Sequence, residues 1–161
     1  MESLQNLSQQ LGELLHQHGL VLTTAESCTG GGVASAVTDI AGSSAWFDRA
    51  FVTYSNEAKM EMLGVRESTL QQYGAVSEQT VEEMVLGALA HSRANIGVSI
   101  SGIAGPGGGS VDKPVGTVCL AWADKNAWLK IETLKFDGDR EQVRYQAVET
   151  ALKVLYEKLK F

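Results

Sequence analysis

The sequence predicts an α/β fold in which a mixed sheet is covered by helices on both faces. Helical and strand-like hydrophobic patterns alternate along the chain, which is typical of such a sheet. Two strand-like runs lie next to each other near the C-terminus, and a late hairpin makes the sheet mixed rather than purely parallel. The length of 161 residues fits one domain, 1–161, that can bury a proper core.

The first elements follow from apolar spacing. A leucine stripe predicts an amphipathic helix that stops near Gly19. A short apolar run at 20–22 predicts a strand, and a glycine-rich turn at 27–32 leads into a helix of small apolar residues over 33–40. The stripe consists of Leu4, Leu7, Leu11, Leu14 and Leu15.

The next segment alternates again. A strand is expected over 49–55, where Phe51, Val52 and Tyr54 are the apolar positions. Two short helices follow, at about 57–63 and at about 67–73. Either Asn56 or Ser55 caps the first of them.

The second half continues with a longer helix capped by Ser77. An alternating strand over 96–100 ends in a glycine-rich loop, 101–113. The runs 115–123 and 128–136 are predicted to form the hairpin, and a long final helix starts at about Asp139.

Composition and charge narrow the class of protein. The formal net charge of −6 argues against a general affinity for nucleic acid or an anionic membrane. No apolar run approaches the roughly 20 residues that span a bilayer, and the first residues lack the basic and apolar regions of a signal peptide. Cys28 and Cys119 form neither a metal-binding spacing nor a disulfide framework. We therefore expect a cytoplasmic enzyme or binding protein without a metal or other cofactor.

Polar side chains are predicted at the carboxyl ends of three strands, where sites of α/β sheets usually lie. Ser27 follows the first strand, Tyr54 ends the second, and Ser101 opens the loop after the third. We expect these three to meet along one edge of the sheet.

The turn after the first strand offers two nucleophiles, Ser27 and Cys28. The following helix is expected to present unpaired backbone N–H groups at Thr29, Gly30 and Gly31, which suit either a phosphate or an oxyanion hole. Cysteine is intrinsically the better nucleophile, so the residues alone leave the choice open.

Residue types alone also do not decide which side chain acts as the general base. His16, His18 and His91 fall on or near predicted helix ends, where helix capping or surface solvation explains them. Without histidine, a neutral lysine can activate serine. Lys59 is the candidate, because it would fall in the first turn of its helix if Asn56 is the cap, and there the dipole disfavours a cation. A solvated surface lysine is the alternative.

The second glycine-rich loop allows close approach to a ligand at Ser101, Gly102 and Gly105. It matches neither a Walker motif nor the Rossmann spacing. Arg140, at the start of the last helix, is suited to clamp a phosphate or carboxylate. Asp137 and Asp139 are expected to cap that helix or to hold Arg140.

Six blocks in one order give the chain a specific resemblance to the CinA C-terminal domain family, in particular to its stand-alone members, which are nicotinamide-nucleotide amidases. The blocks are Thr24-Ala25-Glu26-Ser27-Cys28-Thr29-Gly30-Gly31, Thr38-Asp39-Ile40-Ala41-Gly42-Ser43-Ser44-Ala45-Trp46-Phe47, Phe51-Val52-Thr53-Tyr54-Ser55-Asn56-Glu57-Ala58-Lys59, Gly74-Ala75-Val76-Ser77, Ser99-Ile100-Ser101-Gly102-Ile103-Ala104-Gly105-Pro106, and Lys113-Pro114-Val115-Gly116-Thr117. The resemblance extends from Leu4 to about Leu155.

The resemblance implies a three-layer α/β/α sandwich with a mixed, mostly parallel sheet. It also implies hydrolysis of nicotinamide mononucleotide to nicotinate mononucleotide and ammonia, a step in pyridine-nucleotide recycling, with no cofactor. The catalytic serine, tyrosine and lysine of the family match Ser27, Tyr54 and Lys59. Many relatives carry a molybdopterin-binding-like domain in front of this one, and we expect no activity of that domain here.

Two other functions stay open at this point. The chain could be a regulatory module that binds a nucleotide without turnover, or, less in keeping with the missing Walker lysine and paired carboxylates, a phosphoryl-transfer enzyme. Trp122 and Trp128 of the hairpin fit either the core or a subunit interface, and a homo-oligomer is slightly favoured.

Overall fold

The computed structural model describes residues 2–161 and contains a five-stranded sheet in the order β2-β1-β3-β4-β5. The strands β1, β2 and β3 pair in parallel, whereas β3–β4 and β4–β5 are antiparallel, so the sheet is mixed as predicted and only β4 runs against the others. The bounds of the strands are Leu22–Glu26 (β1), Phe47–Val52 (β2), Ile96–Gly102 (β3), Thr117–Asp124 (β4) and Leu129–Lys135 (β5).

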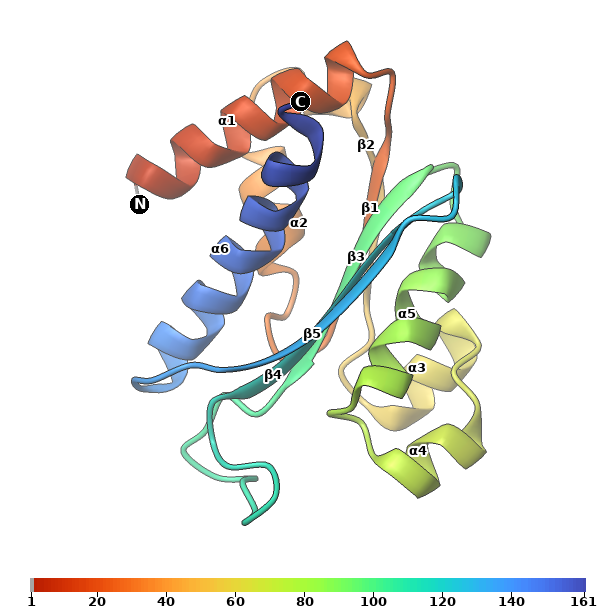
Figure 1. Cartoon of the computed structure of the whole chain (residues 1–161), viewed down its shortest axis with the longest axis vertical. Coiled ribbons are helices and arrows are strands. Elements are labelled where there is room, and N and C mark those ends of the chain that lie inside the picture. The colour runs from red at the N-terminus through yellow and green to blue at the C-terminus, as the bar shows by residue number, and fades with distance from the viewer. Residues whose placement is uncertain (1) are drawn as a thin grey trace.

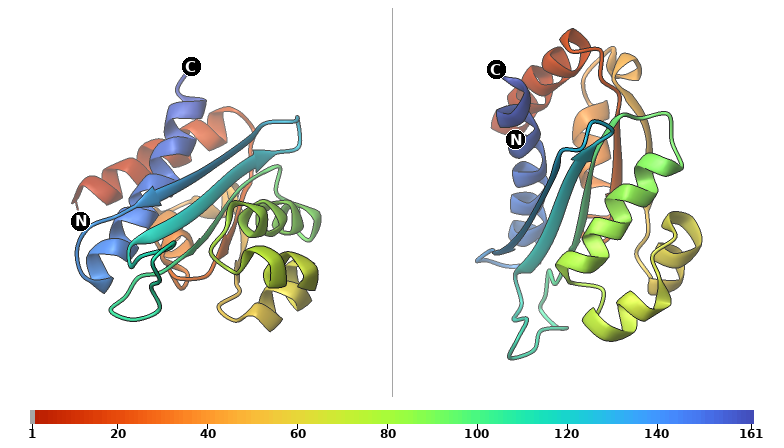
Figure 2. Two further views of the ribbon diagram at one scale, coloured as in Figure 1. Left: turned by 60° about the horizontal axis from the view of Figure 1, so that its bottom comes forward. Right: turned by 45° about the vertical axis from the view of Figure 1, so that its right-hand side comes forward.

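Helices cover both faces of this sheet and form the outer layers of a three-layer sandwich (Figure 1). On one face lie α1 (Glu2–Gln17), α2 (Gly32–Thr38) and α6 (Arg140–Leu159). On the other lie α3 (Asn56–Leu63), α4 (Glu67–Tyr73) and α5 (Glu78–Ala90), and a single 3₁₀ turn at Ser43–Ala45 precedes β2. The two views of Figure 2 show the sheet between these two sets of helices.

Successive side chains of β4 point to opposite faces of the sheet, so this one strand contributes to both hydrophobic cores. Its residues Val118, Leu120 and Trp122 are fully buried against the α1/α2/α6 face. The residues between them, Cys119, Ala121 and Ala123, point to the other face, where the smaller side chains pack with α5. Trp122 therefore belongs to the core, and Trp128 packs against the same core.

Most predicted elements are present, with shifted bounds at β2. This strand begins at Phe47 rather than at 49 and ends at Val52 rather than at 55. Its ladder continues for one more residue, because Thr53 N–H donates to Glu26 O at 2.8 Å, and the chain then turns into α3. Ser55, not Asn56, is the N-cap of α3, since its hydroxyl accepts from Ala58 N–H at 3.0 Å.

No helix within residues 2–161 has both the length and the apolar character needed to cross a membrane.

Candidate active site

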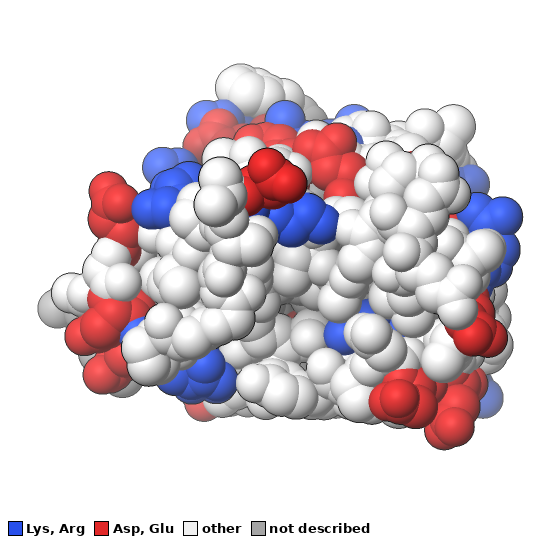
Figure 3. All heavy atoms as spheres, turned by 90° about the horizontal axis from the view of Figure 1, so that it is seen from below, with Lys and Arg blue, Asp and Glu red and all other residues white. Residues whose placement is uncertain are grey.

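Three segments that are distant in sequence converge at the carboxyl ends of β1, β2 and β3. They enclose a cavity of about 230 Å³. Six of the predicted residues line it: Ser27, Tyr54, Lys59, Ser101, Gly102 and Arg140. The view of this edge in Figure 3 shows a hollowed surface with basic side chains beside it. The predicted meeting of the three strand ends is confirmed.

Lys59 and Ser27 form the centre of the cavity. Lys59 Nζ lies 3.2 Å from Ser27 Oγ, and it also donates to Thr53 O at 3.0 Å and to Tyr54 O at 3.3 Å. A neutral amine has two N–H groups and one lone pair. In the neutral form, donation to the two backbone carbonyls leaves the lone pair to accept the hydroxyl proton of Ser27, which in this structure is directed at Tyr54 O, 3.4 Å away.

The environment of Lys59 favours this neutral form. The side chain is 1% exposed, and burial lowers the pKa of its amine, with the nearby Cys28 opposing this more weakly. Among the ion pairs of the described chain none involves Lys59, so no carboxylate restores the charge. Because Ser55 is the cap, Lys59 is the fourth residue of α3 rather than a first-turn residue, and burial rather than the helix dipole is the main cause.

The start of α2 differs from the expectation that its N–H groups are free for a ligand. The carboxylate of Glu26, which is fully buried, accepts from Val33 N–H at 2.9 Å and from Ala34 N–H at 3.0 Å. It also accepts from the hydroxyls of Thr29 at 2.6 Å and Thr24 at 3.1 Å. The protein's own anion therefore occupies the helix N-terminus, and a phosphate has no place there.

Thr29, Gly30 and Gly31 do not line the cavity. Gly30 N–H is already used, because it donates to Ser27 O at 3.0 Å, and the N–H of Ser27 itself donates to Ile100 O at 3.0 Å. In the described chain the N–H groups of Cys28, Thr29 and Gly31 have no acceptor. Of these three residues only Cys28 lines the cavity, so the N–H of Cys28 is the donor of this turn that is left for an oxyanion.

Two arginines of α6 hold the loops around the cavity. Arg140 donates to Gly105 O at 2.8 Å and to the hydroxyl of Tyr54 at 3.3 Å. One turn further, Arg144 donates to Cys28 O at 3.0 Å and to Thr29 O at 3.2 Å. It therefore holds the turn at 27–31 that carries Ser27, which we call the nucleophile turn. Sequence spacing placed Arg144 one turn after Arg140 but gave no sign of this role.

The acidic neighbours of Arg140 do not hold it. Asp139 is the N-cap of α6 in a capping box with Gln142, as the sequence predicts. The carboxylate of Asp137 faces Lys135 instead, at 3.4 Å, and is fully exposed to solvent.

Tyr54 and Cys28 have different surroundings from Ser27. The side chain of Tyr54 is 62% exposed, so Tyr54 is not a core aromatic residue, and its hydroxyl accepts a hydrogen bond from Arg140. Cys28 is buried, and burial raises the pKa of its thiol to about 11. A thiol that holds its proton this firmly is a poor nucleophile, so the geometry favours Ser27.

The wall segment Ala75–Val76, between α4 and α5, is a part of the cavity that the sequence reasoning missed, together with Asn56 and Ala104. Gly74, with a φ of 84°, and the cap Ser77 bracket this segment. They were the available signals of a fixed turn. The histidines play no part in the cavity: His18 contacts Leu159 O, and His91 contacts Gly87 O at a helix end.

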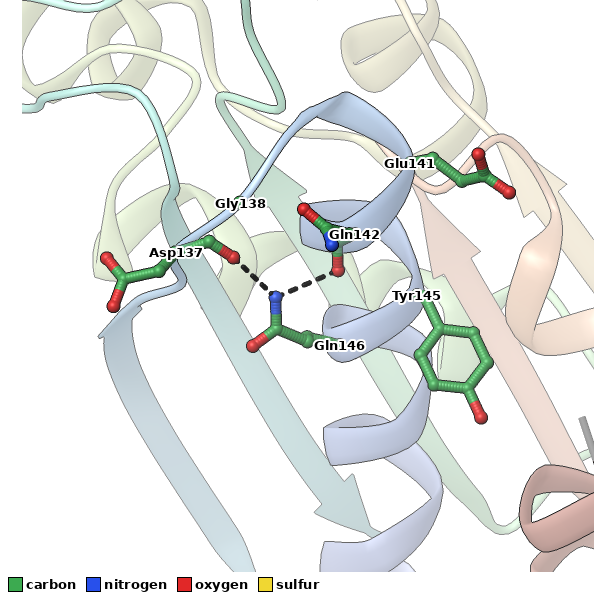
Figure 4. A pocket seen from close by; sticks show the side chains of 6 residues that line it. All are labelled: Asp137, Gly138, Glu141, Gln142, Tyr145 and Gln146. Carbon is green, nitrogen blue, oxygen red and sulfur yellow. Dashed lines mark hydrogen bonds between the residues drawn. The ribbon is translucent and has the colours of Figure 1, made fainter.

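A larger cavity, of about 640 Å³, lies at the start of α6 (Figure 4). Its lining holds no nucleophile and no basic side chain: Asp137, Gly138, Glu141, Gln142, Tyr145 and Gln146. Gln146 uses its amide to donate to Asp137 O at 2.8 Å and to Gln142 O at 2.9 Å, which braces the first turn of the helix. Across residues 2–161 no cluster of three His, Cys, Asp or Glu side chains is arranged to hold a metal ion.

Comparisons with known proteins show the family to which the chain belongs. The family model of the CinA C-terminal domain matches residues 4–159. The nicotinamide-nucleotide amidohydrolase PncC of Escherichia coli K12 is 58% identical over 154 residues, which cover 96% of this chain and 93% of that protein. PncC of Pseudomonas putida is 53% identical over 152 residues, 94% of each protein. The crystal structure of the competence/damage inducible protein CihA from Agrobacterium tumefaciens superposes with a TM-score of 0.93 at 48% identity, covering 96% of this chain and 94% of that one.

Proposed function

Because the chain belongs to the CinA C-terminal domain family and is an amidase, we propose that it hydrolyses nicotinamide mononucleotide to nicotinate mononucleotide and ammonia, with Ser27 as nucleophile and Lys59 as base. The observation that carries the mechanism is the buried Lys59 amine, 3.2 Å from Ser27 Oγ and without a carboxylate partner. The substrate follows from the names of the relatives that match over nearly the full length.

The first half of the reaction is acyl transfer to Ser27. Lys59 Nζ takes the hydroxyl proton while Ser27 Oγ attacks the carboxamide carbon. The oxygen of the tetrahedral intermediate accepts from the free N–H of Cys28, and one well-placed donor of this kind is worth about 3–4 kcal/mol. Lys59 then returns its proton to the departing nitrogen, and ammonia leaves from a nicotinoyl ester of Ser27.

The second half restores the enzyme. Water attacks the ester carbonyl with Lys59 again as base, the bond to Ser27 Oγ breaks, and the proton returns to Oγ. The hydroxyl of Tyr54 accepts from Arg140, and its side chain has no hydrogen bond to Ser27 or Lys59 in the described chain, so the mechanism routes no proton through it. We assign Tyr54 to substrate positioning at the cavity mouth.

The phosphate of the substrate fits the Arg140 side of the cavity. Glu26 fills the N-terminus of α2, so that helix offers no anion site. Arg140 is exposed and lines the cavity. Its guanidinium group has five N–H donors and makes one hydrogen bond to Gly105 O and one to the Tyr54 hydroxyl, so further N–H groups remain for phosphate oxygens. Ser101 and Gly102 line the same cavity, whereas Gly105 does not line it and contacts Arg140 through its carbonyl. In the cell this reaction would be a step in pyridine-nucleotide recycling.

Ammonia release from nicotinamide mononucleotide tests the proposal. We expect steady release by the wild type in buffer without added metal, and a fall of about a thousandfold or more in kcat for Ser27→Ala and for Lys59→Ala. Cys28→Ala is the matched control beside the nucleophile, and it should stay within about threefold of the wild type because its buried thiol takes no part.

Two results would contradict the proposal. Turnover that survives Ser27→Ala but is lost in Cys28→Ala would move the nucleophile to the thiol. Tight binding of the nucleotide by a wild type that releases no ammonia would make the protein a binding module.

A further inference from the structure

We propose that Lys113 is a positioning residue that fastens the glycine-rich loop to the wall of the active-site cavity and thereby sets the affinity for substrate. The inference rests on the proposed function for its kinetic readout. It concerns a residue outside the cavity lining, and the contact that carries it links two segments about 40 positions apart, Tyr73 and Lys113.

The contact is short and charge-assisted. Lys113 Nζ donates to Tyr73 O at 2.7 Å. Tyr73 is the last residue of α4, so its carbonyl belongs to the negative end of the helix dipole, where a cation is favoured. The next residue is Gly74, whose φ of 84° favours glycine, and a Cβ added there would be in ordinary van der Waals contact with Lys113 Nζ at 3.5 Å.

The loop end of the contact is itself fixed. Lys113 N–H donates to Ser110 Oγ at 3.1 Å, and Ser110 N–H donates to Lys113 O at 2.9 Å. These two bonds close a tight turn at the tip of the loop. At the neck, Gly116 N–H donates to Ile103 O at 2.7 Å. Two side-chain contacts then attach the loop to the rest of the protein. Arg140 of α6 donates to Gly105 O, and Lys113 of the loop donates to Tyr73 O.

The wall end of the contact lines the cavity. Ala75 and Val76, which follow Tyr73 and Gly74, face the catalytic cavity on one side. On the other side Val76 borders a second cavity, of about 370 Å³, that Lys113 also lines. Ala75–Val76 therefore lies between two cavities, and Lys113 contacts this segment's neighbour Tyr73 from the loop that follows Ser101, Gly102 and Ala104, which also line the catalytic cavity.

Loss of the contact should loosen both walls without touching the Ser27–Lys59 pair. For Lys113→Met, which keeps the length and removes the charge, we expect KM for nicotinamide mononucleotide to rise about tenfold while kcat stays within about twofold. Lys113→Arg should keep KM within about threefold of the wild type, because a guanidinium can still donate to Tyr73 O. Lys125→Met, at an exposed hairpin turn, is the matched control and should change neither constant.

Hydrogen exchange of the ligand-free protein gives a second readout that does not need turnover. In Lys113→Met, peptides covering 103–117 and 74–77 should exchange faster, and the rest of the chain should not. A partly unfolded variant would lower kcat and leave KM unchanged, so an unchanged KM or an unchanged exchange of both segments overturns the proposal. If the wild type releases no ammonia, the proposed function has failed, and the exchange comparison alone decides whether Lys113 fastens the loop.

Discussion

At the scale of single residues, the proposed mechanism depends on a lysine whose burial lowers the pKa of its amine and so favours the neutral form. Two backbone carbonyls and one hydroxyl surround Lys59 Nζ, and the side chain is excluded from water. These neighbours satisfy the hydrogen-bonding groups of a neutral amine but do not neutralise an ammonium ion. The same contacts that make Lys59 a base therefore aim it at Ser27.

This environment predicts how activity depends on pH. The reactive form is neutral Lys59, and burial lowers the pKa of its amine below its ordinary value. Activity should therefore rise with pH and level off well before the ordinary lysine value of about 10.4. A kcat/KM profile between pH 5 and pH 11 checks this. An acid limb that titrates at the ordinary lysine value, or none at all, would show that Lys59 is not the base.

At the scale of elements, α2 begins on a carboxylate rather than on a ligand. Glu26 joins β1, the nucleophile turn and α2 through four hydrogen bonds. A buried charge without a cation is tolerated here because every oxygen accepts two donors.

Substitution of Glu26 tests this role. Glu26→Gln keeps the shape but replaces one acceptor oxygen by a donor that faces other donors. We expect it to lower the free energy of unfolding by about 1–3 kcal/mol, measured by urea unfolding, and to lower kcat of the folded protein because the nucleophile turn shifts. Glu82→Gln, on the surface of α5, is the control. A Glu26→Gln protein of wild-type stability and kcat would contradict the role.

The elements also show what the sequence could and could not predict. Apolar spacing predicted α1, α5 and α6, and the Ser77 and Asp139 caps are confirmed, because local hydrogen bonds and apolar stripes decide them. The bounds of β2 depend on pairing with β1, a partner far along the chain, and were shifted. The role of Glu26 is a tertiary contact between a strand end and a helix start. Nothing in the local pattern distinguishes it from a surface glutamate.

At the scale of the whole molecule, the residues that stabilise the fold and the candidate catalytic residues lie at different parts of the sheet. The candidate catalytic residues lie at one edge, whereas the two hydrophobic cores lie on the two faces. Convergence of three strand ends was predictable from the order of strands and helices. The wall at Ala75–Val76 was not, because it depends on how α4 and α5 pack against the finished sheet.

Trp122 tests this separation. It is fully buried in the α1/α2/α6 core, and its indole N–H donates to Ala151 O at 3.1 Å, linking β4 to α6. Trp122→Phe should lower the free energy of unfolding by about 1–3 kcal/mol through lost volume and the unpaired carbonyl. Below the unfolding transition, kcat/KM should stay within about twofold of the wild type. A large loss of kcat/KM in the fully folded variant would show that core and site are coupled.

The central claim is that Ser27 forms a covalent bond to the substrate during turnover. Rapid acid quenching of the enzyme with nicotinamide mononucleotide, followed by mass spectrometry of the peptides, tests it most directly. The mechanism predicts an acyl adduct on Ser27 that is absent from Ser27→Ala. An adduct on Cys28, or full turnover by Ser27→Ala with no adduct on the protein, would contradict it.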